Sequence, residues 1–247
     1  MGKKKLKTIR AGRQVRQILY PASYPSDKPT VRAGKQKASS EAQRMLNRRN
    51  VCERAQDMIA ENFDVGDLFA TFTYDAKHYP SSRAAAEKNA TRLVAAIRKV
   101  WRARGWGDPK IFWVTEEKHH HNDPEMNGRL HHHLIIKAPP SKCYALLRSC
   151  WKRGRVVEIE KLRVDKEKNF ETIARYLCKE APEVSKHQLH MTKNSSKPDV
   201  SVRWVDGSET LQPPKGSLVF LTLNKHDYQH GGGWEYAYYI LPLKRHR

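Results

Sequence analysis

Three consecutive histidines interrupt an apolar stretch near the middle of the chain, where residues 129–136 have the sequence RLHHHLII. Successive side chains of a β-strand point to opposite faces, so His131 and His133 share one face and His132 lies on the other. Two imidazoles side by side can chelate one divalent metal ion. Because a surface strand can also carry histidines without a metal, this interpretation depends on what else reaches that face.

A candidate third ligand follows the preceding apolar run. Residues 111–115 (IFWVT) have strand character and are followed directly by Glu116 and Glu117. If this strand pairs as a hairpin with 130–137, one of the two carboxylates lies within reach of the histidines. Two imidazoles and a carboxylate suit Mg²⁺ or Mn²⁺ and offer too few oxygens for a dedicated calcium site. A second triplet, His119-His120-His121, falls in the polar loop between the strands.

A tyrosine with a lysine one helical turn later could supply a nucleophile. Residues 170–180 (FETIARYLCKE) predict an amphipathic helix, with Tyr176 and Lys179 beside its apolar stripe. A tyrosine that attacks a phosphodiester must lose its proton, and its ordinary pKa is about 10. A cation such as Lys179 can assist that loss. Amphipathic helices often carry an interfacial tyrosine, so this pair has weight only together with the histidines.

The elements that must position these residues follow a recognisable order. We predict strands at 68–74, 111–115, 130–137 and 155–162. A helix capped by Ser81 or Ser82 runs to Arg104, another opens at Pro139-Pro140-Ser141 and ends at Gly154, and the tyrosine helix comes last. The order βαββαβ predicts an α+β fold with a split βαβ, RRM-like antiparallel sheet and an added helix that carries the nucleophile. The first and third strands would lie in its middle.

The flanks of this core are basic. Residues 1–54 hold fifteen Lys or Arg residues against three acids and contain Pro21, Pro25 and Pro29, which predicts a basic flexible N-terminal arm. Residues 55–182 form the predicted folded domain. Residues 183–247 form a basic C-terminal extension, in which 218–223 and 236–241 predict a β-hairpin.

The composition indicates a polyanionic partner. The formal charge is +21, from 47 Lys and Arg against 26 Asp and Glu, which favours nucleic acid over a membrane. No run approaches the ~20 apolar residues of a spanning helix, and we expect a cytoplasmic protein. The four cysteines form no CxxC pair and are expected to be reduced, although a zinc-stabilised module using Cys143 or Cys150 is an alternative.

Three segments resemble, in order, the three motifs of rolling-circle replication initiators of the HUH class, found in small bacteriophages and plasmids. They are FATFTY at 69–74, GRLHHHLII at 128–136 and ARYLCKE at 174–180. The resemblance covers about residues 65–200, and the basic segment 191–198 also looks like one that follows the tyrosine helix in such proteins.

The resemblance implies a role for each candidate residue. His131 and His133 would be metal ligands, Glu116 the acidic ligand with Glu117 as the alternative, and Mg²⁺ or Mn²⁺ the ion. Tyr176 would be a single nucleophile supported by Lys179. The family's usual residue between the two ligand histidines is hydrophobic, so His132 is a departure.

The implied protein is a replication initiator. Residues 55–182 would be an HUH endonuclease domain that nicks and rejoins single-stranded DNA at an origin, giving a 5′-phosphotyrosine and a free 3′-hydroxyl. Host DNA polymerase and helicase would be its partners, in the cytoplasm of a bacterial host. The alternative is a nonenzymatic RNA- or DNA-binding protein on an RRM-like sheet. Against it, the third strand carries histidines where a base-stacking surface needs Phe or Tyr.

Overall fold

A computed structural model describes residues 3–21, 40–118, 129–165, 169–178, 189–225 and 233–242. Lys179 and the triplet His119-His120-His121 lie outside the described residues. The chain divides into two compact units. The first combines Met1–Arg44 with Lys197–Arg247, and the second is Met45–Ser196.

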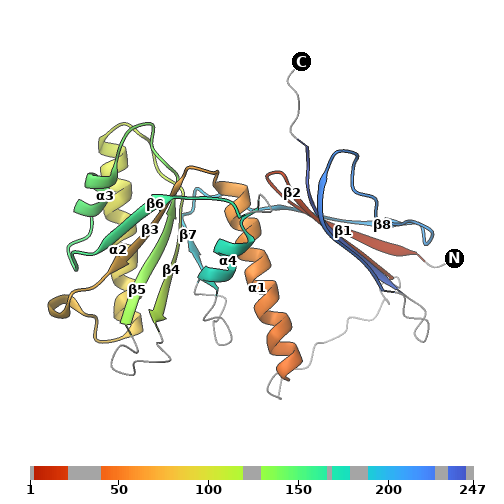
Figure 1. The fold of residues 1–247 in the computed structure, drawn as a ribbon, viewed down its shortest axis with the longest axis horizontal. Coiled ribbons are helices and arrows are strands. Elements are labelled where there is room, and N and C mark those ends of the chain that lie inside the picture. Colours follow the sequence, from red (N-terminus) through yellow and green to blue (C-terminus); the bar gives the residue numbers. More distant parts are fainter. Residues whose placement is uncertain are drawn as a thin grey trace. The chain divides into compact units, whose positions relative to one another are not determined.

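The second unit is built on a five-stranded antiparallel sheet (Figure 1). Its strands, in the order β6-β3-β5-β4-β7, are β3 (Leu68–Thr73), β4 (Ile111–Lys118), β5 (Arg129–Ile136), β6 (Val157–Lys161) and β7 (His190–Met191). The α+β class is confirmed, and the order of β3 to β6 and their helices is compatible with the split βαβ arrangement. The predicted first and third strands, β3 and β5, are inner strands. The short strand β7 was not predicted.

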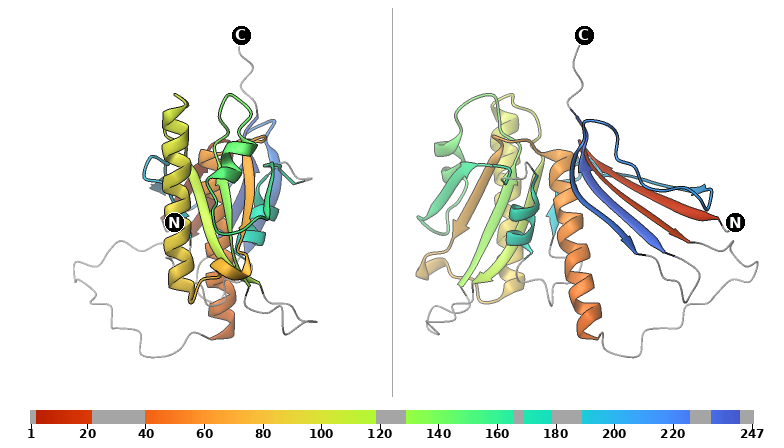
Figure 2. Two further views of the ribbon diagram at one scale, coloured as in Figure 1. Left: turned by 90° about the vertical axis from the view of Figure 1, so that its left-hand side faces the viewer. Right: turned by 45° about the vertical axis from the view of Figure 1, so that its right-hand side comes forward.

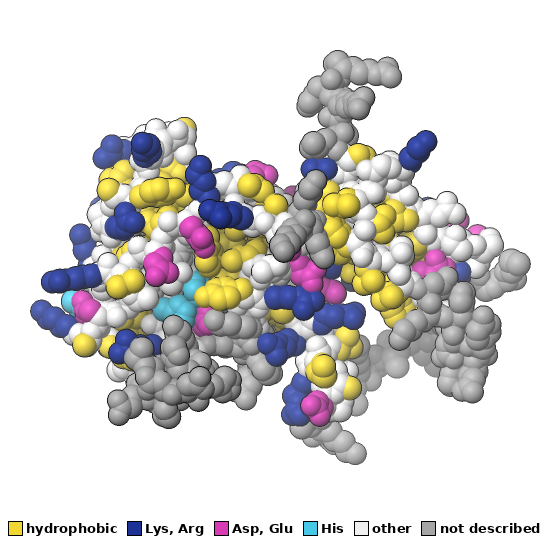
Figure 3. Space-filling view, viewed as in Figure 1, with side chains coloured by type: hydrophobic (Ala, Val, Ile, Leu, Met, Phe, Trp, Pro, Cys, Tyr) yellow, Lys and Arg dark blue, Asp and Glu magenta, His cyan; other side chains and the backbone are white. Residues whose placement is uncertain are grey.

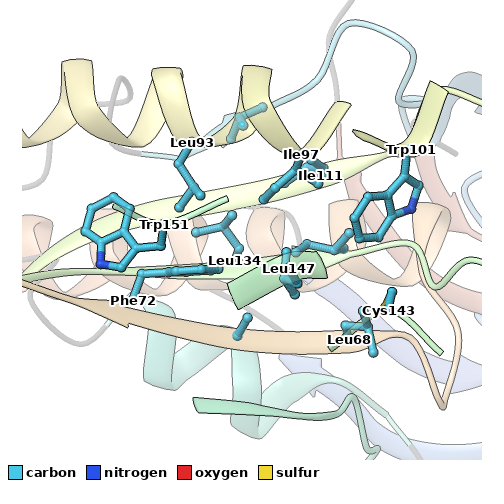
Figure 4. Close-up of a cluster of buried hydrophobic side chains, with 13 residues drawn as sticks. Leu68, Phe72, Leu93, Ile97, Trp101, Ile111, Leu134, Cys143, Leu147 and Trp151 are labelled. Atoms are coloured by element: carbon cyan, nitrogen blue, oxygen red, sulfur yellow. The ribbon is translucent and has the colours of Figure 1, made fainter. Parts of the chain in front are cut away.

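Two helices cover one face of this sheet. They are α2 (Arg83–Ala103), whose N-cap Ser82 accepts a hydrogen bond from the Ala85 amide, and α3 (Tyr144–Ser149). Large apolar side chains from α2, α3 and the inner strands interdigitate between the layers (Figure 4). Trp101 and Trp151 belong to this buried cluster. The core therefore fixes the strands whose opposite face carries the histidine pair.

The other face is covered by α1 (Glu41–Asn62) and α4 (Glu171–Leu177), as Figure 2 shows. Helix α1 lies largely within the segment predicted as an arm. Its buried stripe is confined to the C-terminal half and includes polar residues, which weakens the helical periodicity. Gln56 hydrogen bonds to Asn169, and Asn62 donates to the Ser196 carbonyl. None of the described helices has the length and hydrophobicity to cross a membrane.

The first unit is a second five-stranded antiparallel sheet, ordered β8-β1-β2-β10-β9. Its strands are β1 (Lys4–Ala11), β2 (Gln14–Pro21), β8 (Asp199–Val205), β9 (Leu218–Lys225) and β10 (Trp234–Ile240). β9 and β10 pair antiparallel where the sequence predicts a hairpin. A short 3₁₀ helix, η1 (Ala76–His78), completes the elements of the described residues.

The structure differs from the flexible arm predicted for residues 1–54. Strands β1 and β2 form a hairpin, turning at Gly12, whose φ of 55° lies in the left-handed region that favours glycine. β1 also pairs with β8 and β2 with β10, so the partners that complete the hairpin lie far along the chain. The dense positive charge hid the short apolar pattern of this hairpin, and no local window contains its partners.

The packing of α1 predicts different effects for two substitutions on the same helix. Ile59→Ala removes a fully buried side chain and should lower the free energy of unfolding of the second unit by about 2–5 kcal/mol. Met45→Ala removes a side chain that is 69% exposed, and should change it by less than about 0.5 kcal/mol. Urea unfolding followed by tryptophan fluorescence compares the two. Equal midpoints would show that α1 does not pack on the sheet.

Candidate metal and tyrosine site

Glu116, His131 and His133 converge on one face of the second unit's sheet and are close enough to hold a metal ion. The register of β4 and β5 places Glu116 directly opposite His131. Oε2 of Glu116 lies 2.7 Å from Nε2 of His133 and 3.3 Å from Nε2 of His131, and the two Nε2 atoms are 3.0 Å apart. All three side chains are buried. Glu117, the alternative ligand, is not in the cluster.

Hydrogen bonds on the far side of both imidazoles orient their Nε2 atoms inward. Nδ1 of His131 lies 3.2 Å from the carbonyl oxygen of Arg129. A carbonyl only accepts, so this Nδ1 carries the proton of the neutral ring and leaves the Nε2 lone pair directed at the cluster. Nδ1 of His133 lies 3.0 Å from Oγ1 of Thr71 on β3. Such outer contacts are typical of metal-binding histidines, and the donor set fits a divalent ion.

His132 points to the opposite face, as strand alternation predicts. It is fully buried, with Nε2 2.7 Å from the Tyr74 hydroxyl and Nδ1 3.0 Å from Oγ1 of Thr115. Burial, together with the neighbouring His131 and His133, lowers the pKa of His132 to about 3. These two hydrogen bonds explain how a polar residue occupies a position that is usually hydrophobic in the proteins it resembles.

Tyr176 of α4 lies at the rim of the metal cluster. Its hydroxyl is 3.4 Å from Nε2 of His133, and its ring meets the imidazole edge-on with centroids 5.1 Å apart. The side chain is 40% exposed, so a ligand can reach it. Phe69 stacks on His133 at 5.5 Å and meets Tyr176 edge-on at 6.3 Å. Phe69 therefore fixes both rings.

Phe69 and Thr71 were not predicted as parts of the site. Their spacing of two residues is that of side chains on one face of a strand. Both lie on β3, which pairs with β5 so that Thr71 is directly opposite His133. Alternation then puts Phe69 and Thr71 on the face of the histidine pair. Only the register identifies them, because the same apolar run could equally be core.

A pocket of about 570 Å³ opens beside Tyr176. It is lined by β3, by β6 and the segment that follows it, and by α4. Phe69, Thr71 and Tyr176 belong both to this lining and to the surroundings of the metal cluster. In the space-filling view, histidine side chains are visible at the surface beside hydrophobic and acidic side chains (Figure 3). The pocket is of nucleotide size and lies beside the cluster, whose own three side chains are buried.

The comparison with protein families agrees with this arrangement. Residues 67–181 match the family model of replication-associated protein ORF2/G2P. The match spans the sheet strands β3 to β6, the metal cluster and Tyr176, and it supports a replication initiator family. A search of curated proteins and a search of solved structures gave no match. The zinc alternative has no support, since the cluster contains no cysteine and all four cysteines are free thiols.

The cluster predicts a clear contrast between two neighbouring glutamates. Glu116→Gln, His131→Ala and His133→Ala should each weaken Mn²⁺ binding by about 100-fold or more, because each removes one of three ligands. Glu117→Gln makes the same change of charge one position along the strand and should leave the affinity unchanged. Calorimetric titration with MnCl₂ measures all four. If Glu117→Gln lost Mn²⁺ affinity and Glu116→Gln retained it, the acidic ligand would be Glu117.

Proposed function

We propose that the chain is an HUH endonuclease that nicks and rejoins single-stranded DNA at a replication origin, with Tyr176 as its nucleophile. The observation that carries the proposal is the Tyr176 hydroxyl at the rim of the Glu116, His131 and His133 cluster. The match of residues 67–181 to a replication-associated protein family supports the same function. Lys179 follows Tyr176 by three residues, and although Lys77 follows Tyr74 by the same spacing, the Tyr74 hydroxyl contacts His132 on the opposite face of the sheet.

Glu116, His131 and His133 would hold Mg²⁺ or Mn²⁺, which supplies Lewis-acid polarisation of a phosphodiester when bound. Tyr176 Oη forms a bond to phosphorus, the bond from phosphorus to the 3′-oxygen breaks, and that oxygen leaves as a 3′-hydroxyl after taking up a proton. The product is a 5′-phosphotyrosine. Lys179, next to the described end of α4, would favour the phenolate form.

The proposed linkage also explains how one site can both start and finish a replication round. A phosphotyrosine conserves the energy of the phosphodiester, so a 3′-hydroxyl can attack it and release Tyr176. Between the two steps, a host DNA polymerase would extend the free 3′-end and a host helicase would open the duplex, in the bacterial cytoplasm. The pocket beside Tyr176 would hold a nucleotide that flanks the scissile phosphate.

The surroundings of β3 and β5 favour the enzyme over the nonenzymatic RRM-like binding protein. A base-stacking surface needs exposed aromatic rings on the two inner strands. On the site face, Phe69 is buried between His133 and Tyr176, and the facing positions of β5 carry His131 and His133. Helices α1 and α4 cover the rest of that face. Little aromatic surface is left there for bases.

Replacing the proposed nucleophile separates chemistry from binding. Tyr176→Phe keeps the ring that packs on Phe69 and His133, so folding and Mn²⁺ binding should be retained. Cleavage of labelled single-stranded origin DNA, and the protease-sensitive covalent adduct, should fall by about 10³-fold or more. Denaturing gels measure both products.

Tyr144→Phe is the matched control. Tyr144 lies on α3, against the opposite face of the sheet, and its 38% exposure is close to that of Tyr176. The Tyr144→Phe protein should cleave like the parent. An adduct that survives in Tyr176→Phe and disappears in Tyr144→Phe would move the nucleophile and refute the proposed mechanism.

A further inference from the structure

The sheet of the first unit separates its side chains into two chemically different faces. Strand register and alternation place Lys5, Trp204, Arg16 and Tyr238 on the same side, since Lys5 is opposite Trp204 and Arg16 is opposite Tyr238. We call this side the aromatic face. Its aromatic residues are Tyr20, Trp204, Trp234, Tyr236 and Tyr238, together with Phe220, which packs on Tyr238 at the β9 bulge. On the opposite face, the described strands carry one aromatic residue, Tyr239.

Charge is divided in the same way. Lys5, Lys7 and Arg16 lie on the aromatic face, and the described strand side chains of that face include no carboxylate. Asp199 and Glu235 lie on the opposite face, by their pairing with Arg10 and Leu19. The aromatic face is therefore positive although its strands are part of a sheet that also carries acids.

The segment after β8 covers the opposite face. Leu211 packs against Leu6 and Leu19 from this segment, and its amide donates to Oε2 of Glu235. Lys4 also reaches Glu235, at 3.8 Å, and donates to the carbonyl of Glu209. The opposite face thus has its own small core with neutralised charges. On the aromatic face, Arg16, Tyr236 and Tyr238 are buried, whereas Lys5, Tyr20 and Trp204 are partly exposed.

Cations and rings on the aromatic face are held against one another. The Lys5 ammonium lies 4.5 Å above the Trp204 ring, and the Arg16 guanidinium lies 4.2 Å above the Tyr238 ring. Arg16 also donates to the Tyr236 hydroxyl at 3.0 Å, but Arg16, Tyr236 and Tyr238 are buried, so the accessible cation and ring are Lys5 and Trp204. Trp204 and Trp234 retain partial exposure, as do Tyr20 and Phe220. Val200 and Val202, on the same face of β8, are each 53% exposed.

Aromatic rings interleaved with cations on one sheet face are the features that bind single-stranded nucleic acid. Bases of any sequence stack on such rings, while Lys and Arg neutralise phosphates. We propose that the aromatic face of the first unit is a second nucleic-acid site, separate from the metal cluster and without metal or chemistry of its own. Its ligand is a single strand, because a duplex offers phosphates but keeps its bases stacked inside. The positive face and the polyanionic strand are complementary in charge.

A pair of double charge reversals on the two faces tests this site in the full-length chain. Lys5→Glu with Lys7→Glu alters the aromatic face on β1. Arg10→Glu with Arg203→Glu makes the same change of charge on the opposite face, on β1 and its partner β8. The probe is a fluorescein-labelled 20-nucleotide oligo-dT, followed by anisotropy in EDTA so that no metal-dependent step contributes.

The aromatic-face variant should bind oligo-dT about tenfold more weakly or worse, and the slope of log K against log salt should become smaller by roughly 1.4, which is two phosphate contacts on a single strand. The control variant should retain most of the parent's affinity and its slope. Equal losses in both variants would mean that only the overall charge matters and would overturn the proposal. Circular dichroism confirms that both variants are folded.

Stacking is tested separately with Trp204→Ala. This variant should weaken oligo-dT binding about fivefold or more and leave the binding of a fully paired hairpin DNA unchanged. Equal losses for both probes would show a phosphate-only surface. Loss of self-association without loss of oligo-dT binding, measured by sedimentation, would identify the face as a contact between copies of the chain and would also refute the site.

Discussion

The site depends on the antiparallel register of β5 with its two neighbours. β4 brings Glu116 opposite His131, and β3 brings Thr71 opposite His133. Side chains alternate with a period of two, so a slip of one residue would send both histidines to the opposite face. The register is itself held by Leu134 and Ile136, which follow the histidines on β5 and have to remain in the core beneath α2 and α3. Packing on one face therefore fixes the chemistry of the other.

The two helices on the site face have different tasks. α1 buries Ala55 and Ile59, and Phe63 follows directly after it, so that together they close the core on one face of the sheet. α4 contributes Ala174 and Leu177 to the same core and leaves Tyr176 at the boundary between core and solvent. As the proposed nucleophile, Tyr176 would be held near the candidate metal ligands by a helix that is anchored on one side, and would still be open to a substrate. Phe69 contacts the rings of both Tyr176 and His133 and so connects α4 with the cluster.

In the first unit, a sheet fixes the positions of the basic residues of β1 and β2. The basic residues near the N-terminus are part of a sheet, where pairing with β8 and β10 separates them between two faces. One face also carries Asp199 and Glu235, the second of which pairs with Lys4, and on the other face Lys5 lies beside an aromatic ring. A folded surface orders its cations in advance, so less side-chain entropy is lost on binding than in a flexible tail. In the proposed second site, this order would let the first unit bind a single strand in a way that its charge alone would not define.

The sequence by itself determined the order and type of the elements from β3 to α4, because their hydrophobic periods and caps are local. It also determined that His131 and His133 share a face and that Tyr176 lies beside an apolar stripe. Only the tertiary structure showed that Glu116, and not Glu117, lies in the cluster with the histidines, since that depends on the register between two strands. It also decided the roles of Phe69, of α1 and of the β1–β2 hairpin. Their partners lie up to some two hundred residues away, and no local pattern records a contact between segments that meet only when the chain has folded.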